Sequence, residues 1–133
     1  MAFNGDKAPL AGMLYSVAGM PVVYVIGEDW TLRAGVRAEL RERGINALGM
    51  ETAADVDGVL AAGEVPAAMV LDAGAKAASD PAIQALAGRV PTVVIASRTT
   101  AISLGSAAKI FFRPVQIREI VTAILELLKG RSV

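Results

Sequence analysis

The sequence feature that most constrains the fold is a short apolar run that ends in a single aspartate. Residues 67–71 are all apolar, Asp72 follows them, and Gly74 comes two residues later. Because the run is unbroken and starts directly after Pro66, it predicts a strand buried on both faces of a parallel sheet. In open α/β sheets, ligands and reacting groups gather at the carboxyl ends of the central strands. Asp72 is therefore a candidate functional residue, although an aspartate in this place can also serve only to open a turn.

Strands and helices are predicted to alternate along the chain. Four more apolar or β-branched segments predict strands, at residues 22–26, 45–50, 92–96 and 109–112. Apolar residues at helical spacing predict a helix after each strand, and the helix between the last two strands is short, at residues 101–107. This pattern predicts an α/β fold with a doubly wound, five-stranded parallel sheet and a shortened fourth helix.

The chain is expected to form one domain with a short extension. Its 133 residues suffice for a single sizeable core, and the predicted sheet and helices take up residues 21–133. Residues 1–20 form a mixed N-terminal extension, in which residues 9–17 are a candidate for a short, weak helix. No apolar run approaches the ~20 residues of a membrane span, and the first residues lack the pattern of a secretory signal. We therefore expect a cytoplasmic protein without a membrane partner.

Two absent residue types exclude much of enzyme chemistry. The sequence has no histidine and no cysteine, which removes Ser-His and Cys-His nucleophiles, imidazole and thiolate metal ligands, and disulfides. Its 13 basic and 13 acidic residues are intermixed without a basic stripe, so no nucleic-acid partner is expected. Neither common type of glycine-rich phosphate loop occurs. The chain is not expected to be an enzyme, and its polar chemistry depends on carboxylates, hydroxyls, lysine and arginine.

Polar residues follow four of the five predicted strands. The loops after the first, third, fourth and fifth strands carry, in turn, Glu28 with Asp29, then Asp72, Ser97 and Arg113. Because these loops can converge on one edge of a parallel sheet, their carboxylates can form the oxygen-rich site that Mg²⁺ accepts. A hydroxyl and a cation across the same pocket can hold phosphoryl oxygens, which suits metal-assisted phosphorylation of an aspartate. Glu28 and Asp29 could equally do no more than cap the next helix, and Arg113 could be a strand-end charge that pairs with Asp72.

Four segments carry a resemblance to one known family. They are Glu28-Asp29 with Leu32-Arg33, then Val70-Leu71-Asp72, then residues 91–97, and finally Phe112-Arg113-Pro114. In this order and spacing, residues 21–129 resemble the receiver domain of two-component response regulators, the CheY-like family, which has a flavodoxin-like fold.

The resemblance implies roles for the residues at the strand ends. Asp72 would be the phosphoacceptor, and Arg113 and the hydroxyl of Ser97 would contact the phosphoryl group. Mg²⁺ would be the cofactor and a histidine kinase a candidate partner. The candidate metal ligands are Glu28, Asp29, Asp72 and the backbone carbonyl of Gly74.

The sequence departs from the family pattern at this site. The run of three acidic residues after the first strand begins here with Gly27, so one carboxylate is missing. The family's threonine or serine falls on Ala96, with Ser97 one place late. The family's lysine is Arg113, which is bulkier and has a forked head group. Weak Mg²⁺ binding and weak phosphorylation are therefore expected.

The sequence also departs from the family pattern on the surface through which receivers usually signal that they are phosphorylated. The usual proline four residues after the acceptor is Lys76, and the aromatic switch position on the fifth strand is Ile110. Because the fourth helix is short, Ile110 and neighbouring apolar atoms are expected to be less covered than in an intact receiver. Uncovered apolar patches usually mark interaction sites, so residues 100–128 are the predicted surface for a protein partner or a homodimer.

Three functions remain open on these grounds. The first is an atypical receiver-like module that acts by protein–protein contact, with weak or absent phosphorylation at Asp72. The second is a conventional Mg²⁺-dependent phosphoacceptor receiver that tolerates its substitutions. The third is a small α/β enzyme or nucleotide-binding domain at the same edge, which the missing histidine, cysteine and phosphate loop disfavour.

Overall fold

The structure is a computed structural model that describes residues 20–97 and 107–131. Its elements follow in the predicted order: β1 (Val22–Ile26), α2 (Trp30–Glu42), β2 (Asn46–Met50), α3 (Ala53–Ala61), β3 (Ala68–Asp72), η1 (Lys76–Ser79), α4 (Pro81–Ala87), β4 (Thr92–Ala96), β5 (Lys109–Phe112) and α5 (Ile117–Arg131). The 3₁₀ turn η1 was not predicted. The predicted helix at residues 9–17, and all but the last residue of the one predicted at 101–107, lie outside the described residues.

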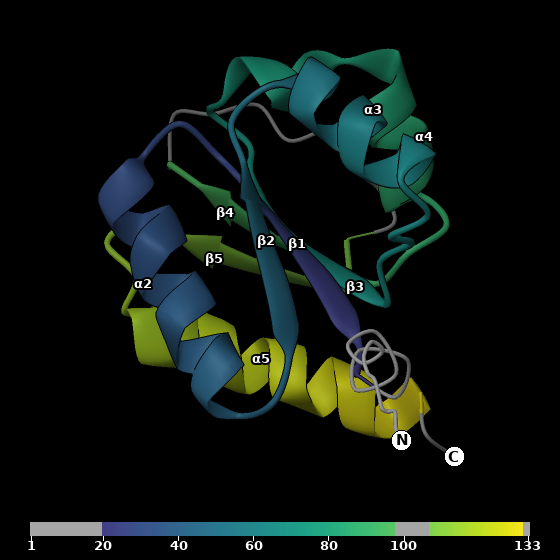
Figure 1. The fold of residues 1–133 in the computed structure, drawn as a ribbon. Coiled ribbons are helices and arrows are strands. Elements are labelled where there is room, and N and C mark those ends of the chain that lie inside the picture. Colours follow the sequence, from purple (N-terminus) through teal and green to yellow (C-terminus); the bar gives the residue numbers. More distant parts are fainter. Residues whose placement is uncertain (1–19, 98–106, 132–133) are drawn as a thin grey trace, which may run out of the picture.

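The five strands form one parallel sheet, with the order β2-β1-β3-β4-β5. The chain moves outward from β1 to β2, returns to β3 on the other side of β1, and then continues through β4 to β5 (Figure 1). The reversal between β1 and β3 makes the sheet doubly wound, which confirms the predicted fold class. It also leaves β2 and β5 as the two edge strands of the sheet.

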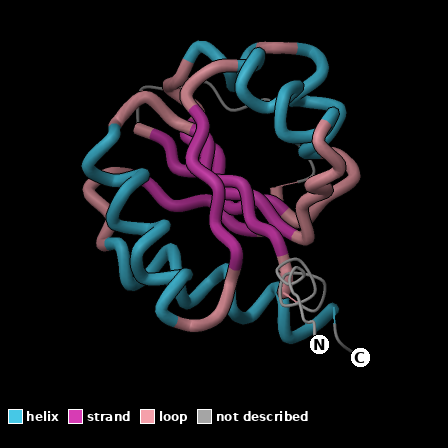
Figure 2. The backbone as a smooth tube through the Cα atoms, viewed as in Figure 1, coloured by secondary structure: helices cyan, strands magenta, loops and turns pink. Residues whose placement is uncertain are grey.

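The helices cover both faces of the sheet (Figure 1; Figure 2). One apolar core lies between the sheet and the helices α2 and α5, and it includes Val70 of β3. The other lies between the sheet and the helices α3 and α4, and it includes Leu71. Because successive side chains of a strand point to opposite faces, Asp72 follows Val70 on the face covered by α2 and α5. None of the helices within the two described segments is both long and apolar enough to span a membrane.

Local signals in the sequence set the helix ends. Thr52 caps α3, since its hydroxyl accepts a hydrogen bond from the Asp55 N–H at 3.1 Å while the Asp55 carboxylate accepts one from the Thr52 N–H at 3.2 Å. These two reciprocal hydrogen bonds form a capping box. Gly44 follows the C-cap of α2 with a φ of 79°, a conformation that glycine adopts without strain. These caps fix where the chain turns back to enter β2 and α3.

Candidate functional site

Asp72 is the last residue of β3, a strand in the middle of the sheet. Its Oδ1 accepts a hydrogen bond from the Gly74 N–H at 3.0 Å, so the carboxylate does open the turn that follows the strand. The side chain is only 14% exposed. With Oδ1 bound to the backbone, Oδ2 is the oxygen that faces the other residues of this edge. Asp72 therefore both opens a turn and offers an oxygen at the strand end.

Arg113 occupies the space in front of that oxygen. It follows β5, and its NH2 group lies 2.9 Å from the Asp72 Oδ2. Its NH1 group lies 3.6 Å from an oxygen of Asp29, whose other oxygen caps α2 by accepting a hydrogen bond from the Leu32 N–H. The two halves of the guanidinium thus reach two carboxylates from different loops. A positive charge of the protein itself therefore lies between two of the predicted metal ligands.

The remaining residues of the β1 loop do not complete a metal site. Gly27 lies beside Asp72, and a Cβ at this position would come 3.1 Å from the Asp72 Cβ, so the glycine leaves no carboxylate here and little room for one. The Glu28 carboxylate is engaged elsewhere, because it accepts a hydrogen bond from the Lys76 N–H at 3.0 Å. In the described part of the chain, no three acidic side chains form a group that could hold a metal ion.

These contacts bear directly on Mg²⁺. The ion prefers near-octahedral oxygen ligands and is usually held by one or two carboxylates. Here the two nearest carboxylates, Asp29 and Asp72, already share Arg113. Gly74 approaches Asp72 through its N–H group. The side chains as they are placed do not fit a resident divalent metal, and weak binding of Mg²⁺ stays a prediction.

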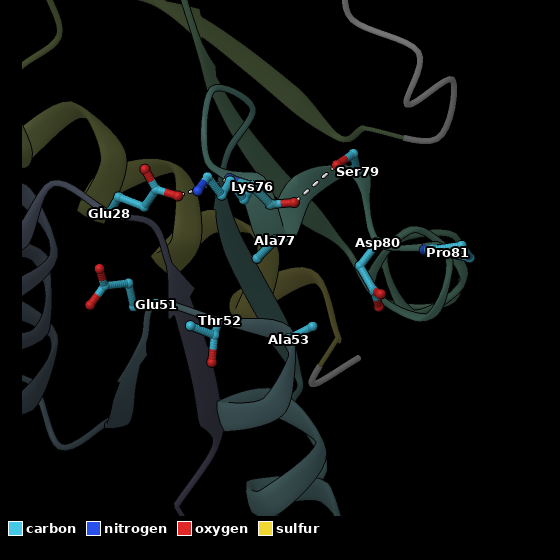
Figure 3. Close-up of a pocket in the computed structure, with 9 residues that line it drawn as sticks. All are labelled: Glu28, Glu51, Thr52, Ala53, Lys76, Ala77, Ser79, Asp80 and Pro81. Atoms are coloured by element: carbon cyan, nitrogen blue, oxygen red, sulfur yellow. Dashed lines mark hydrogen bonds between the residues drawn. The ribbon is translucent and has the colours of Figure 1, made fainter.

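Glu28 lines a separate hollow beside the site (Figure 3). The hollow has a volume of about 640 Å³ and lies between the start of α3 and the segment η1 to Pro81. Its charged lining residues are Glu28, Glu51, Asp80 and Lys76. The predicted cluster of acidic residues is therefore divided, with Asp29 beside Asp72 and Glu28 on the side of α3 and α4.

The strand β4 brings a methyl group rather than a hydroxyl to this edge. Ala96 is its last residue, is 1% exposed and pairs with Phe112 of β5. The Ala96 carbonyl accepts a hydrogen bond from the Arg113 N–H at 2.8 Å, which fixes the start of the loop that carries the guanidinium. Ser97 lies one residue beyond the strand and is partly buried.

One further residue at the site was not predicted from the sequence. Arg33 of α2 donates a hydrogen bond from NH1 to the Gly27 carbonyl. Together with Asp29 and Asp72 it lines a small cavity of about 10 Å³ below the strand ends. Its position four residues after Asp29, on the same side of a helix, was the signal that could have identified it.

Comparison with solved structures shows the fold of a receiver domain. The chain is similar to a response regulator receiver protein from Burkholderia phymatum, with 22% identity, a TM-score of 0.67, and coverage of 82% of this chain and 95% of the other. It is also similar to the receiver domain of the Francisella response regulator 1452, with 16% identity, a TM-score of 0.67, and coverage of 84% and 98%. A third similar structure is the signal receiver domain of an HD domain-containing protein from Pseudomonas fluorescens Pf-5, with 12% identity, a TM-score of 0.69, and coverage of 85% and 98%.

The similarity lies in the structure rather than in the sequence. No protein-family model matches the chain, and no curated protein matches it at a significant level. The chain has the CheY-like receiver fold over nearly the full length of the solved domains. At this level of identity, the function has to be argued from the residues of the site.

Proposed function

We propose that the chain is an atypical receiver-like signalling module that acts by protein–protein contact and is phosphorylated at Asp72 weakly or not at all. The observation that carries this proposal is the position of Arg113, whose guanidinium lies between Asp72 and Asp29. The fold supports the same class of function, because the solved structures that it resembles are described as response regulator receiver domains. The module is a binding protein rather than an enzyme.

Phosphorylation requires the Asp72 Oδ2 to attack phosphorus while a cation neutralises the charge between the two groups. Charge-assisted hydrogen bonds of the kind Arg113 makes are among the stronger ones in proteins, and they occupy that oxygen. A metal ion would have to displace the guanidinium without the help of a carboxylate at Gly27 or of Glu28. Ala96 offers no hydroxyl to hold a phosphoryl oxygen.

The test is labelling by a small phosphodonor. The purified protein is incubated with acetyl phosphate and Mg²⁺, and intact mass spectrometry measures the phosphoryl group transferred to the Asp72 carboxylate as acetate leaves. We expect labelling far below one group per chain, loss of any label in Asp72→Asn, and no change in Asp57→Asn, which removes an equal charge from α3. Arg113→Lys should raise the label, because a single ammonium cannot bridge both carboxylates.

The conventional receiver is the alternative that this experiment separates. Stoichiometric and long-lived labelling of the wild type at Asp72 would establish a phosphoacceptor that tolerates Arg113, and would make a histidine kinase the partner to search for. A label at another residue would contradict the assignment of Asp72 as the reactive strand end.

We further propose that protein contact uses the β5–α5 surface, defined as β5 and the exposed residues Arg118, Thr122 and Glu126 of α5. Ile110 and Phe112 of β5 are large apolar residues with 37% and 42% of their surface exposed. Neighbouring exposed apolar groups on an edge strand are typical of a surface that binds a partner. Part of the region named from the sequence, residues 100–106, lies outside the described residues, so the proposal is confined to β5 and α5.

A further inference from the structure

Three arginines form a row along α2, at positions that share one side of the helix. They are Arg33, Arg37 and Arg41, four residues apart. Each donates to a main-chain carbonyl of β2 or of the loop after β1. Arg33 NH1 donates to the Gly27 carbonyl, and the Nε groups of Arg37 and Arg41 both donate to the Ala47 carbonyl, at 3.3 and 3.2 Å. The row is therefore fixed in place by the backbone of β2 and of the loop after β1.

The neighbouring strand makes room for this row. β2 is an edge strand, and Gly49 lies under the side chains of Arg33 and Arg37. A Cβ at Gly49 would come 2.7 Å from the Arg37 Cδ and 3.2 Å from the Arg33 Cδ. The two arginine stems thus occupy the space that any larger residue at position 49 would fill. The packing orders the charged groups before any ligand binds.

Within the described residues, no carboxylate lies at ion-pair distance from the row, although the charges of Arg33 and Asp55 interact at longer range. Arg43, the C-cap residue of α2, differs from them because it pairs with Glu39 at 3.0 Å. Burial lowers the pKa of the Arg37 guanidinium, and the nearby charges of Arg41 and Arg33 lower it further. A guanidinium has five N–H donors, and each of these three uses one on a carbonyl. Most of their donors remain for an anion.

We propose that the arginine row of α2 binds an acidic segment of a protein partner in extended conformation, with carboxylates at alternate positions. Side chains four residues apart on a helix are separated by about 6 Å along its axis. Alternate side chains of an extended strand are about 6.7 Å apart on one face. Carboxylates at positions i, i+2 and i+4 of such a segment can therefore each meet one arginine fork. Arginine is the residue best suited to bind carboxylates in this two-pronged way.

The surroundings of the row favour a short peptide over a long polyanion. Glu42 directly follows Arg41, and Glu51 directly follows β2; both are exposed. Their negative charges disfavour a long line of phosphates more than a short segment, and α2 has three arginines at this spacing. The chain as a whole carries no net charge, with 13 basic and 13 acidic residues. A segment with three acidic side chains matches this length of row.

The test uses a fluorescent hexapeptide of alternating glutamate and threonine, together with the same peptide carrying glutamine in place of glutamate. Fluorescence anisotropy at low ionic strength measures binding to the wild type, to the double variant Arg37→Gln/Arg41→Gln, and to Arg43→Gln. The last variant loses one charge of the same helix but leaves the row intact. We expect the double variant to bind the acidic peptide about tenfold or more weakly, Arg43→Gln to bind almost as the wild type does, and the glutamine peptide to bind to none of them.

A second double variant separates a loss of binding from a loss of folding. Arg37→Lys/Arg41→Lys keeps both charges but loses the forks, and should bind with an intermediate affinity; circular dichroism checks that each variant is folded. Equal binding of the two peptides, equal losses in Arg43→Gln and the double variant, or no binding by the wild type would each overturn the proposal. Tighter binding of a hexathymidylate than of the acidic peptide would overturn it in favour of a nucleic-acid ligand. Because Asp72 takes no part, failure here would leave the proposed function of the receiver-like module untouched.

Discussion

Arg113 determines the electrostatics of the site, because one side chain reaches both carboxylates that remain there. A lysine carries the same charge at a single point, whereas the flat fork of arginine binds Asp72 at 2.9 Å and still comes within 3.6 Å of Asp29. Asp72 is mostly buried and Arg113 is about one-third exposed, so the pair contributes about 1 kcal/mol to stability, the upper end of the range for exposed pairs. As a consequence, the charges of Asp72 and Asp29 are already paired with Arg113 before any cation binds.

The carboxylate of Asp55 gives a prediction about pH. Hydrogen bonds from the Glu51 and Thr52 N–H groups hold the pKa of Asp55 below its ordinary value. A lowered pKa means that this carboxylate stabilises the fold above the pKa of the unfolded chain, about 3.9, and that the contribution is lost as the pH falls through the folded value. We expect Asp55→Asn to lower the free energy of unfolding at neutral pH.

Urea unfolding of the wild type and Asp55→Asn between neutral pH and about pH 3 measures this effect. The difference between the two proteins should shrink as Asp55 is protonated in the wild type. Asp57→Asn on the same helix α3 serves as the control for a lost negative charge. A difference that stays constant down to the lowest pH would show that the charged form of Asp55 is not what stabilises the cap.

At the scale of the elements, alanine in place of Gly58 and alanine in place of Gly44 should change the stability of the protein in opposite directions. Gly58 lies inside α3, and nothing is within 4 Å of a Cβ at this position. Alanine there should stabilise the protein by up to about 1 kcal/mol, since glycine is the poorer helix former. Gly44 also has open space, but its φ of 79° strains any residue with a side chain. Gly44→Ala should therefore destabilise the protein by about 1 kcal/mol, and thermal or urea unfolding of the two variants measures both signs.

The elements themselves were predictable because their signals are local. The apolar run before Asp72 forms the predicted strand β3, and the capping box of Thr52 and the glycine after α2 likewise act within a few residues. The contacts of the site depend instead on residues far apart in the chain. Arg113 meets Asp72 across 41 positions and Glu28 meets the Lys76 N–H across 48. Sequence spacing indicated that these loops share an edge, but could not say which oxygen each donor would meet.

At the scale of the whole molecule, the two edge strands of the sheet present different surfaces. On β2, the outward carbonyl of Ala47 is covered by Arg37 and Arg41. On β5, Ile110 and Phe112 leave apolar surface exposed. An edge strand whose backbone groups are covered is protected from pairing with other chains, whereas an exposed apolar edge favours contact. The asymmetry favours apolar association through β5, whereas the β2 edge offers only the charged contacts of the arginine row.

This difference predicts association that does not depend on Asp72. Sedimentation velocity over a range of concentrations should show self-association of the wild type, or binding of a partner, that is weakened by Ile110→Lys and by Thr122→Glu. Thermal unfolding of each variant is measured in parallel, because Ile110 pairs with Val94 in the sheet. Asp72→Asn should associate as the wild type does. A wild type that stays monomeric and binds no partner, or an Asp72→Asn variant that loses association equally, would show that the β5–α5 surface is not used in this way.

The most direct measurement of the role of Arg113 is a titration with Mg²⁺ that follows Trp30 fluorescence. Trp30 is the only tryptophan, directly follows Asp29 and is 68% exposed, so it should respond when a cation reaches the carboxylates. Calcium serves as a second ion, and Asp72→Asn controls for changes unrelated to the site. Because Arg113 already pairs with Asp72 and Asp29, we expect no saturable change below the millimolar range in the wild type and a saturable one at lower Mg²⁺ in Arg113→Ala. Saturation of the wild type at sub-millimolar Mg²⁺, abolished by Asp72→Asn, would contradict the proposal that the arginine takes the place of the metal.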